Sequence, residues 1–133
     1  MAQVKQITLT ALSKPGVLAK ICGVLSGAGV NLVAISATDG DKRSKLRMVV
    51  SDPVRAKHAL TAAKIRCGEE PALLLTLEDK PGSLGRVAER LAAAKINIKC
   101  TYATTGGGGT AQVVARRRQS GQGGTGPGLR PCD

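Results

Sequence analysis

The chain begins with alternating apolar and polar residues and then changes to a helical spacing. Gln3 to Ala11 alternates and is rich in β-branched residues, which predicts a strand. From Val17 to Ala28 the apolar residues recur at helical spacing, so they would form one face of a helix. Ser13 can cap this helix, and Pro15 suits its first turn, where a missing N–H group costs nothing.

Two further strands, a second helix and a short closing strand are predicted next. A polar turn separates two closely spaced strand-like segments, which should therefore pair as a hairpin. Ser51-Asp52-Pro53 has the cap-then-proline pattern of a helix start. The expected elements are strands at Val30–Thr38 and Lys45–Val50, a helix at Val54–Ala63 and a short strand at Ile65–Cys67. This strand-helix-strand-strand-helix-strand order is the split βαβ pattern of ferredoxin-like α+β folds.

The same order begins again at Pro71 but stops early. The expected elements are strands at Ala72–Leu77, Ile96–Thr104 and Thr110–Val114 and a helix at Pro81–Ala94. No second helix or fourth strand is expected after them, because the apolar pattern ends there. We therefore expect two tandem ferredoxin-like βαββαβ sandwiches. The first covers residues 1–70, the second is truncated and covers residues 71–114, and a disordered tail covers residues 115–133.

The predicted tail is rich in Gly, Pro and Arg and has almost no large apolar side chain. Such a segment cannot bury enough surface to offset the entropy lost on ordering. A second hypothesis is that residues 115–133 are an out-of-frame reading of the coding DNA. Back-translated with chosen GC-rich codons and read one base later, they can spell D-A-K-A-A-K-A-A-L, which resembles D-P-V-R-A-K-H-A-L at Asp52–Leu60. Sequencing the coding DNA decides between the two.

The composition predicts an aliphatic core and a soluble protein. There is no Phe or Trp and only one Tyr, while 42% of the residues are hydrophobic. No apolar run approaches the roughly 20 residues needed to span a bilayer, and the N-terminus lacks the apolar block of a secretory signal. The four cysteines have no metal-binding or redox spacing. We therefore expect a cytoplasmic protein without a membrane, metal or cofactor site.

One sequence motif is shared by the two halves of the chain. Leu12–Leu32 contains L-S-K-P-G-V-L-x-K-I and G-V-N-L, and Glu78–Ile98 contains E-D-K-P-G-S-L-x-R-V and K-I-N-I, aligned without a gap. Such a repeat means that one structural unit is used twice. The two motifs resemble the ACT domain, a family of small amino-acid-binding regulatory modules, over the first unit and over the second through Val114. The resemblance implies a four-stranded antiparallel sheet with two helices on one face, and domains that pair side by side or across faces.

In ACT domains the effector binds where the loop before the first helix of one domain meets the second strand of its neighbour. Carried over, the resemblance places ligand contacts at Ser13, Lys14, Pro15, Gly16, Val17 and Leu18 with Asn31 and Leu32, and at Asp79, Lys80, Pro81, Gly82, Ser83 and Leu84 with Asn97 and Ile98. Backbone N–H groups at a helix start suit the carboxylate of an amino acid, and an Asp or Asn oxygen suits its ammonium group. Ser13 stands where the family often has Asp, so the resemblance favours the Asp79 site.

Other chemistry has weaker support in the sequence. The Lys-Pro-Gly turns could only shape the starts of the helices, and Asp79 could be only a helix cap. Gly106 to Gly109 lacks the Lys-Ser or Lys-Thr of a phosphate loop, and no Ser, Cys or Asp set that would indicate catalysis accompanies His58. The net charge of +11 favours contacts with anions, but the third predicted strand of each unit, Lys45–Val50 and Thr110–Val114, lacks the aromatic residues on which RNA-binding sheets stack bases.

We therefore expect a non-enzymatic regulatory module that binds a small amino acid at the interface between ACT-like domains. It would have no catalytic residues, form a homodimer and act on a separate metabolic enzyme. Two alternatives remain open. One is a structural or assembly protein with a degenerate, empty site, and the other is a weak nucleic-acid binder that relies on its basic charge.

Overall fold

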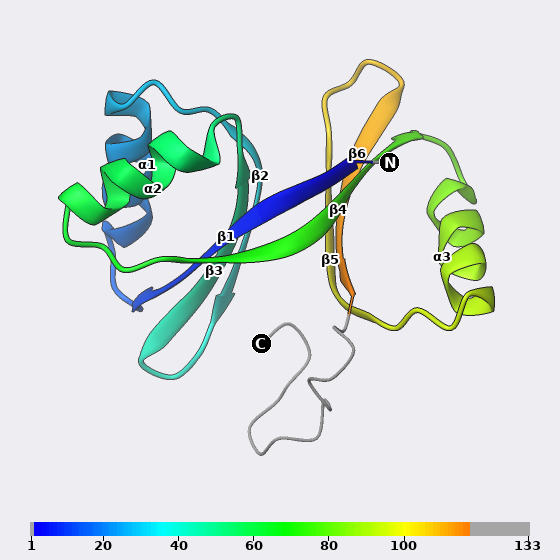
Figure 1. Ribbon diagram of the computed structural model, residues 1–133, viewed down its shortest axis with the longest axis horizontal. Coiled ribbons are helices and arrows are strands. Elements are labelled where there is room, and N and C mark those ends of the chain that lie inside the picture. Colours follow the sequence, from blue (N-terminus) through cyan, green and yellow to red (C-terminus); the bar gives the residue numbers. More distant parts are fainter. Residues whose placement is uncertain (1, 118–133) are drawn as a thin grey trace. The chain divides into compact units, whose positions relative to one another are not determined.

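The computed structural model describes residues 2–117, which contain six strands and three helices. In chain order they are β1 (Ala2–Leu12), α1 (Val17–Gly27), β2 (Leu32–Asp39), β3 (Arg43–Val50), α2 (Pro53–Ala62), β4 (Gly68–Glu78), α3 (Ser83–Ala93), β5 (Ile98–Thr105) and β6 (Thr110–Arg117) (Figure 1). The predicted α+β class is confirmed. The described chain forms two compact units, Val4–Pro71 and the residues from Ala72 onward with those before Val4.

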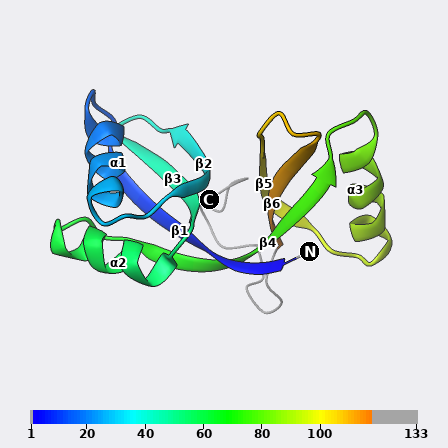
Figure 2. The same cartoon turned by 90° about the horizontal axis from the view of Figure 1, so that it is seen from above.

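In the first unit, antiparallel strands carry two helices on one face. The strand order is β2-β3-β1 with β4 beside β1, and Leu9 of β1 lies opposite Leu46 of β3. Helices α1 and α2 lie on the same side of these strands (Figure 2). The buried core between them consists of Ile7, Leu9, Ile21, Leu25, Val30, Leu46, Met48, Val50, Ala56 and Leu60. This unit has the ferredoxin-like arrangement that the apolar pattern predicted.

The other face of these strands carries a buried arginine. Leu46 and Met48 face the helices, whereas Arg47 lies on the opposite face, in register with Thr8 of β1 and Ser36 of β2. Arg47 is only 1% exposed, and its Nε and Nη2 atoms have no hydrogen-bond partner within residues 2–117. The sequence did not predict this burial, because arginine is rarely buried without a partner.

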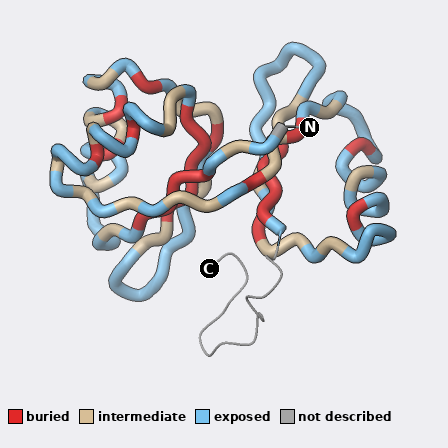
Figure 3. The backbone as a smooth tube through the Cα atoms, in the orientation of Figure 1, coloured by how far each residue is buried: buried red, intermediate tan, exposed pale blue. Residues whose placement is uncertain are grey.

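The second unit has the strand order β4-β6-β5, again antiparallel, with α3 on one face. Leu75 of β4 lies opposite Val113 of β6, and Leu91 of α3 is buried. In both units the buried residues concentrate on the strands and on one side of the helices, whereas the hairpin turns are exposed (Figure 3). The predicted lack of a second helix and fourth strand concerns residues beyond Arg117, which lie outside the described range.

The strand at which the two units meet along the chain is longer than predicted. The sequence predicted separate strands at Ile65–Cys67 and Ala72–Leu77, because the first unit was expected to close before Pro71 and the second to begin there. Strand β4 is instead continuous and includes Pro71. Ile65 follows α2, and its N–H group donates to the carbonyl of Leu60 at 2.8 Å. The predicted strand at Ile65–Cys67 is therefore wrong.

The last described strand also extends beyond its predicted end. The expected strand ended at Val114, whereas β6 includes Ala115 and Arg116, both buried, and ends at Arg117. The first residues of the predicted tail are thus part of a strand. The rest of the predicted tail, residues 118–133, lies outside the described range, as does the out-of-frame hypothesis for them.

Helices α1 and α3 begin in the same way, after a glycine in a left-handed conformation. Gly16 has φ 90° and Gly82 has φ 88°, and each occupies the N-cap position without a side-chain hydrogen bond. Glycine adopts this conformation without steric cost. The prediction that Ser13 caps α1 is therefore wrong. Ser13 lies earlier in the turn, and its hydroxyl donates to the carboxylate of Asp39.

Candidate ligand-binding turns

The turn between β1 and α1 is held against the hairpin between β2 and β3. The N–H group of Ser13 donates to the carbonyl of Lys42 in this hairpin at 2.9 Å. On the helix side, the N–H group of Lys20 donates to the carbonyl of Gly16 at 3.0 Å. The first N–H groups of α1 have no intrahelical acceptor. They therefore remain available for a ligand beside an anchored turn.

One side of this turn forms the wall of a pocket of about 330 Å³. The opposite wall comes from Ala37 of β2 and from Ser44 and Leu46 of β3. The turn contributes Leu12, Ser13, Lys14, Pro15, Val17 and Leu18. Of the residues predicted for this turn, all but Gly16 line the pocket. Its lining is mostly aliphatic, with few polar side chains.

A carboxylate that the sequence had not singled out is hydrogen-bonded to two residues that line this pocket. Asp39 ends β2, and its Oδ1 atom accepts hydrogen bonds from the hydroxyls of Ser13 and Ser44, the latter at 3.2 Å. Both serines line the pocket. No ion pair within residues 2–117 neutralises Asp39. Both hydrogen bonds are to Oδ1, so the Oδ2 atom of Asp39 can accept a hydrogen bond from a cationic ligand.

The two repeats place their carboxylates on opposite sides of the turn. In the gap-free alignment Ser13 corresponds to Asp79, and Asp39 corresponds to Thr105. The first turn therefore has a hydroxyl on the loop and a carboxylate on the strand, whereas the second has the reverse. This exchange is the signal in the sequence from which Asp39 could have been found.

The turn between β4 and α3 repeats the backbone of the first. The N–H group of Asp79 donates to the carbonyl of Gly109 at 2.9 Å, in the hairpin between β5 and β6. The ammonium group of Lys80 lies 2.8 Å from a carboxylate oxygen of Glu78. Ser83 is buried, and its Oγ atom has no hydrogen-bond partner within the described range. This turn brings together the predicted residues Asp79, Lys80, Pro81, Gly82, Ser83 and Leu84.

The predicted strand starts lie away from the turns of their own units. Asn31 and Leu32 are at the start of β2, whereas the carboxylate of Asp39 is at its other end. Both residues line a separate hollow at the end of α1. Asn97 and Ile98 occupy the corresponding place at the start of β5. The expectation that they complete a site from a neighbouring domain stays a prediction.

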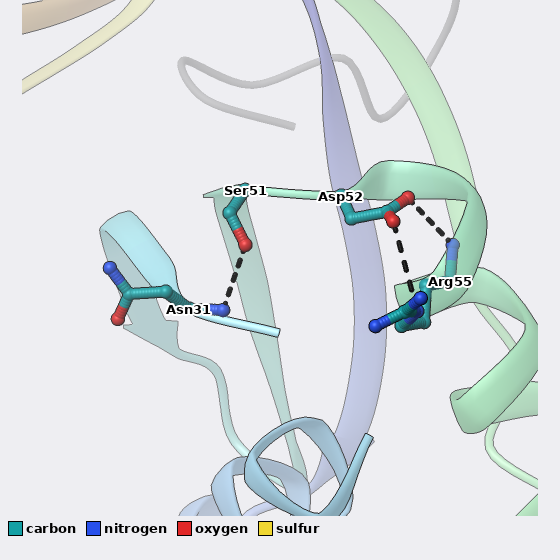
Figure 4. Close-up of polar contacts among 4 residues, drawn as sticks. All are labelled: Asn31, Ser51, Asp52 and Arg55. Atoms are coloured by element: carbon teal, nitrogen blue, oxygen red, sulfur yellow. Dashed lines mark hydrogen bonds and ion pairs between the residues drawn. The ribbon is translucent and has the colours of Figure 1, made fainter. Parts of the chain in front are cut away.

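The backbone around Asn31 is tied to the start of α2 (Figure 4). The N–H group of Asn31 donates to the Ser51 hydroxyl at 2.9 Å, and the Ser51 N–H group donates back to the Asn31 carbonyl at 2.9 Å. Asp52 then caps α2 as predicted, because its carboxylate accepts a hydrogen bond from the N–H group of Arg55 at 3.0 Å. The side chain of Asn31 is left exposed.

The described residues contain no cluster suited to a metal ion, and the thiol of Cys67 has a raised pKa. Within residues 2–117, no three His, Cys, Asp or Glu side chains are placed to share a metal. Burial raises the pKa of the Cys67 thiol, Lys57 opposes this effect and Glu69 adds to it. A thiol of this kind is protonated at neutral pH and is a poor nucleophile. No helix in this range is long and apolar enough to cross a bilayer.

Comparison with known families gives the family of this fold. Residues 2–121 match the family model described as an ACT domain pair. The chain belongs to this family. The resemblance carried by the two Lys-Pro-Gly motifs is thus confirmed, and the fold is that of a regulatory ACT module.

Several solved structures are similar to this chain. Protein BT0572 from Bacteroides thetaiotaomicron aligns with a TM-score of 0.82 and 26% identity, over 88% of this chain and 81% of that protein. The ligand-free regulatory subunit of aspartate kinase from Thermus thermophilus aligns with a TM-score of 0.66 and 17% identity, over 86% and 87%. The corresponding subunit from Thermus flavus gives 0.60 and 16%, over 86% and 84%. No curated protein matches the sequence.

Proposed function

We propose that this chain is a non-enzymatic regulatory protein that binds a small free amino acid at its ACT turns. The observation that carries this proposal is the Asp39 carboxylate, which accepts hydrogen bonds from Ser13 and Ser44, two residues that line the pocket before α1. A carboxylate and an uncapped helix start beside one small pocket match the two charged groups of a zwitterion. Membership of a regulatory family supports the same choice.

Each end of the amino acid would have a matching group in the first unit. Its ammonium group would lie against Asp39, whose charged oxygens accept N–H hydrogen bonds. Its carboxylate would accept hydrogen bonds from the N–H groups at the start of α1, next to Gly16, where no side chain caps the helix. A short side chain would pack against Val17, Leu18 and Leu46. The modest volume of the pocket favours a small amino acid.

The second turn offers the same groups in another arrangement. Asp79 is exposed, has no ion pair within residues 2–117, and precedes the uncapped start of α3 at Gly82. In our proposal Lys80, Pro81, Ser83 and Leu84 complete this turn. Residues from a neighbouring ACT domain would close each site, namely Asn31, Leu32, Asn97 and Ile98, as the family resemblance implies.

We further propose that the chain forms a homodimer and regulates a separate enzyme. Strand β2 lies at the edge of the first unit and β5 at the edge of the second, and such edges can pair with another domain. A ligand bound between domains favours the assembled state by its difference in affinity for the two states. The regulatory subunits of aspartate kinase, which share this fold, support the idea of an enzyme partner.

Thermal unfolding with each of the twenty amino acids at millimolar concentration tests the proposal. A ligand that binds only the native state must raise Tm. We expect at least one small amino acid to raise Tm, Asp39→Asn and Asp79→Asn each to reduce this rise, and the double variant to abolish it. Asp41→Asn is the matched control, because it removes a carboxylate from the same exposed hairpin.

The outcomes separate the proposal from its alternatives. If no amino acid changes Tm, the sites are empty and an assembly protein is favoured. If the rise persists in the double variant, the ligand binds elsewhere and the two turns are not its site. If Asp41→Asn weakens the response as much as Asp39→Asn, the effect comes from overall charge.

A further inference from the structure

A second hollow lies on the other side of the turn between β1 and α1. Its volume is about 570 Å³, and it lies among the end of β1, the start of α1 and the segment between α2 and β4. Five basic residues line it: Lys14, Lys20, Arg43, Lys64 and Arg66. No acidic residue is part of the lining. We call this group of five basic residues and the space between them the basic hollow.

The charges of the basic hollow are not neutralised by neighbouring carboxylates. None of the five residues takes part in an ion pair within residues 2–117. Elsewhere in the first unit, Lys5 and Lys57 both pair with Glu69, at 3.4 and 3.7 Å. Acidic partners are thus used at other lysines of this unit but not here. Five uncompensated positive charges around one space favour a multiply charged anion.

The second repeat shows what a neutralised version of this turn looks like. Lys80 corresponds to Lys14 in the gap-free alignment, and it pairs with Glu78 at 2.8 Å. Leu12 occupies the position of Glu78 in the first repeat. The first turn therefore keeps the lysine and lacks its partner. Of the two turns, the one that lines the basic hollow is thus the one whose lysine has no ion pair within the described residues.

The backbone fixes two of the basic residues and adds N–H donors. Lys64 is held in the left-handed conformation with φ 62°, and its N–H group donates to the carbonyl of Thr61 at 2.9 Å. Ile65, which lies between Lys64 and Arg66 in the chain, packs against the core. This packing fixes the backbone of both basic residues at the rim of the hollow. Gly16, which precedes the uncapped N-terminus of α1, also lines the hollow. Such N–H groups bind phosphate oxygens well.

We propose that the basic hollow binds a small anion that carries two or more phosphate groups. Charge selects the anion, because the zwitterion of an amino acid has no net charge to exploit five basic side chains. Val17, Ile21 and Ile65 give the hollow an apolar part, which suits a ligand with an organic portion such as a nucleotide. The basic hollow shares the turn before α1 with the amino-acid pocket, but its other basic residues lie outside that pocket, so different probes and variants test the two sites.

Isothermal titration with inorganic pyrophosphate and with ATP, at fixed ionic strength, tests the proposal. Lys64→Gln with Arg66→Gln removes two charges from the rim and should weaken binding at least about tenfold. Lys5→Gln with Lys57→Gln is the matched control, because it removes the same charge from lysines paired with Glu69. We expect this control to bind like the wild type. Circular dichroism verifies that both variants are folded.

Each result decides for or against the site. Weaker binding in the rim variant alone supports it, as does weaker binding of monophosphate and sulfate than of pyrophosphate. Equal weakening in the two variants would assign binding to the net charge of the chain and overturn the proposal. Binding of a short DNA duplex without any binding of pyrophosphate or ATP would overturn it in favour of a nucleic-acid surface. No binding of any of these probes would also overturn it.

Discussion

Ser13 and Asp79 hold the same position in the two turns, yet only the second is acidic. In the first turn the acid is Asp39, which reaches the Ser13 hydroxyl from the end of β2. A carboxylate that arrives from the strand gives the pocket the same charge as one on the loop. Comparison with the family motif at a single position would therefore underrate the first turn. Comparing both pairs of positions, Ser13 with Asp79 and Asp39 with Thr105, shows that each turn has one carboxylate at these positions.

Exchanging the two residue types tests this equivalence directly. Ser13→Asp with Asp39→Thr transfers the arrangement of the second turn to the first. In an Asp79→Asn background, we expect this variant to keep the amino-acid-dependent rise in Tm, because the carboxylate is moved and not lost. Asp39→Thr alone, in the same background, should abolish the rise. If the exchange variant behaves like Asp39→Thr alone, the two arrangements are not equivalent.

Glycine at the start of α1 should be required for its conformation. Gly16→Ala is expected to lower the free energy of unfolding by about 1–2 kcal/mol, because φ is +90° there. Gly23→Ala, inside α1, should instead raise it by about 0.5–1 kcal/mol. At Gly23 the added Cβ meets no atom within 4 Å and φ is not in the left-handed range. Urea unfolding measures both values, and changes of the same sign would contradict this account.

Cys67 should react slowly with iodoacetamide near neutral pH. Burial raises its pKa, so the thiolate fraction is smaller than for an ordinary thiol and grows as the pH rises. Lys57→Gln removes the charge that lowers this pKa and should slow the reaction further, whereas Glu69→Gln should speed it. Mass spectrometry of the Cys67 peptide measures the rates. Changes in the opposite directions would show that these charges do not act on the thiol.

Among the secondary-structure elements, the three helices and strand β1 lie within two residues of their predicted bounds. Helices α1 and α3 lie within a few residues of their predicted bounds, because a stripe of apolar residues depends only on local spacing. Strand β4 was divided in two because the second unit was expected to begin at Pro71. Its continuity is visible only once its neighbours are known. The contact of Asp39 with Ser13 was missed for the same reason, since it joins residues distant in sequence.

The two faces of α1 should differ sharply in their contribution to stability. Leu25 is 1% exposed and belongs to the core, whereas Leu18 is 50% exposed at the rim of the pocket. Leu25→Ala should therefore lower the free energy of unfolding by about 2–5 kcal/mol. Leu18→Ala should change it by less than about 1 kcal/mol. Denaturant unfolding compares the two, and similar losses would place Leu18 in the core.

At the scale of the whole molecule, duplication has produced two units with similar backbones and different charges. The backbone turns match closely, down to the left-handed Gly16 and Gly82. The first turn borders the basic hollow, whereas in the second Lys80 is paired with Glu78. The motif in the sequence predicted the shared backbone. The difference in charge depends on side chains outside the motif, so a match to the family could not reveal it.

One short turn separates the amino-acid pocket from the basic hollow. Both spaces are lined by Lys14, Pro15 and Val17. Ligands on the two sides would draw on the same N–H groups at the start of α1, which makes them antagonists. Pyrophosphate should raise the Kd of the amino acid, and by thermodynamic linkage the amino acid should raise the Kd of pyrophosphate by the same factor. Titrating the protein with each ligand, in the presence of a saturating concentration of the other, measures both factors. Unchanged Kd values would mean that binding at one site does not affect the other. With antagonism, occupancy would report the ratio of two metabolites instead of the amount of one.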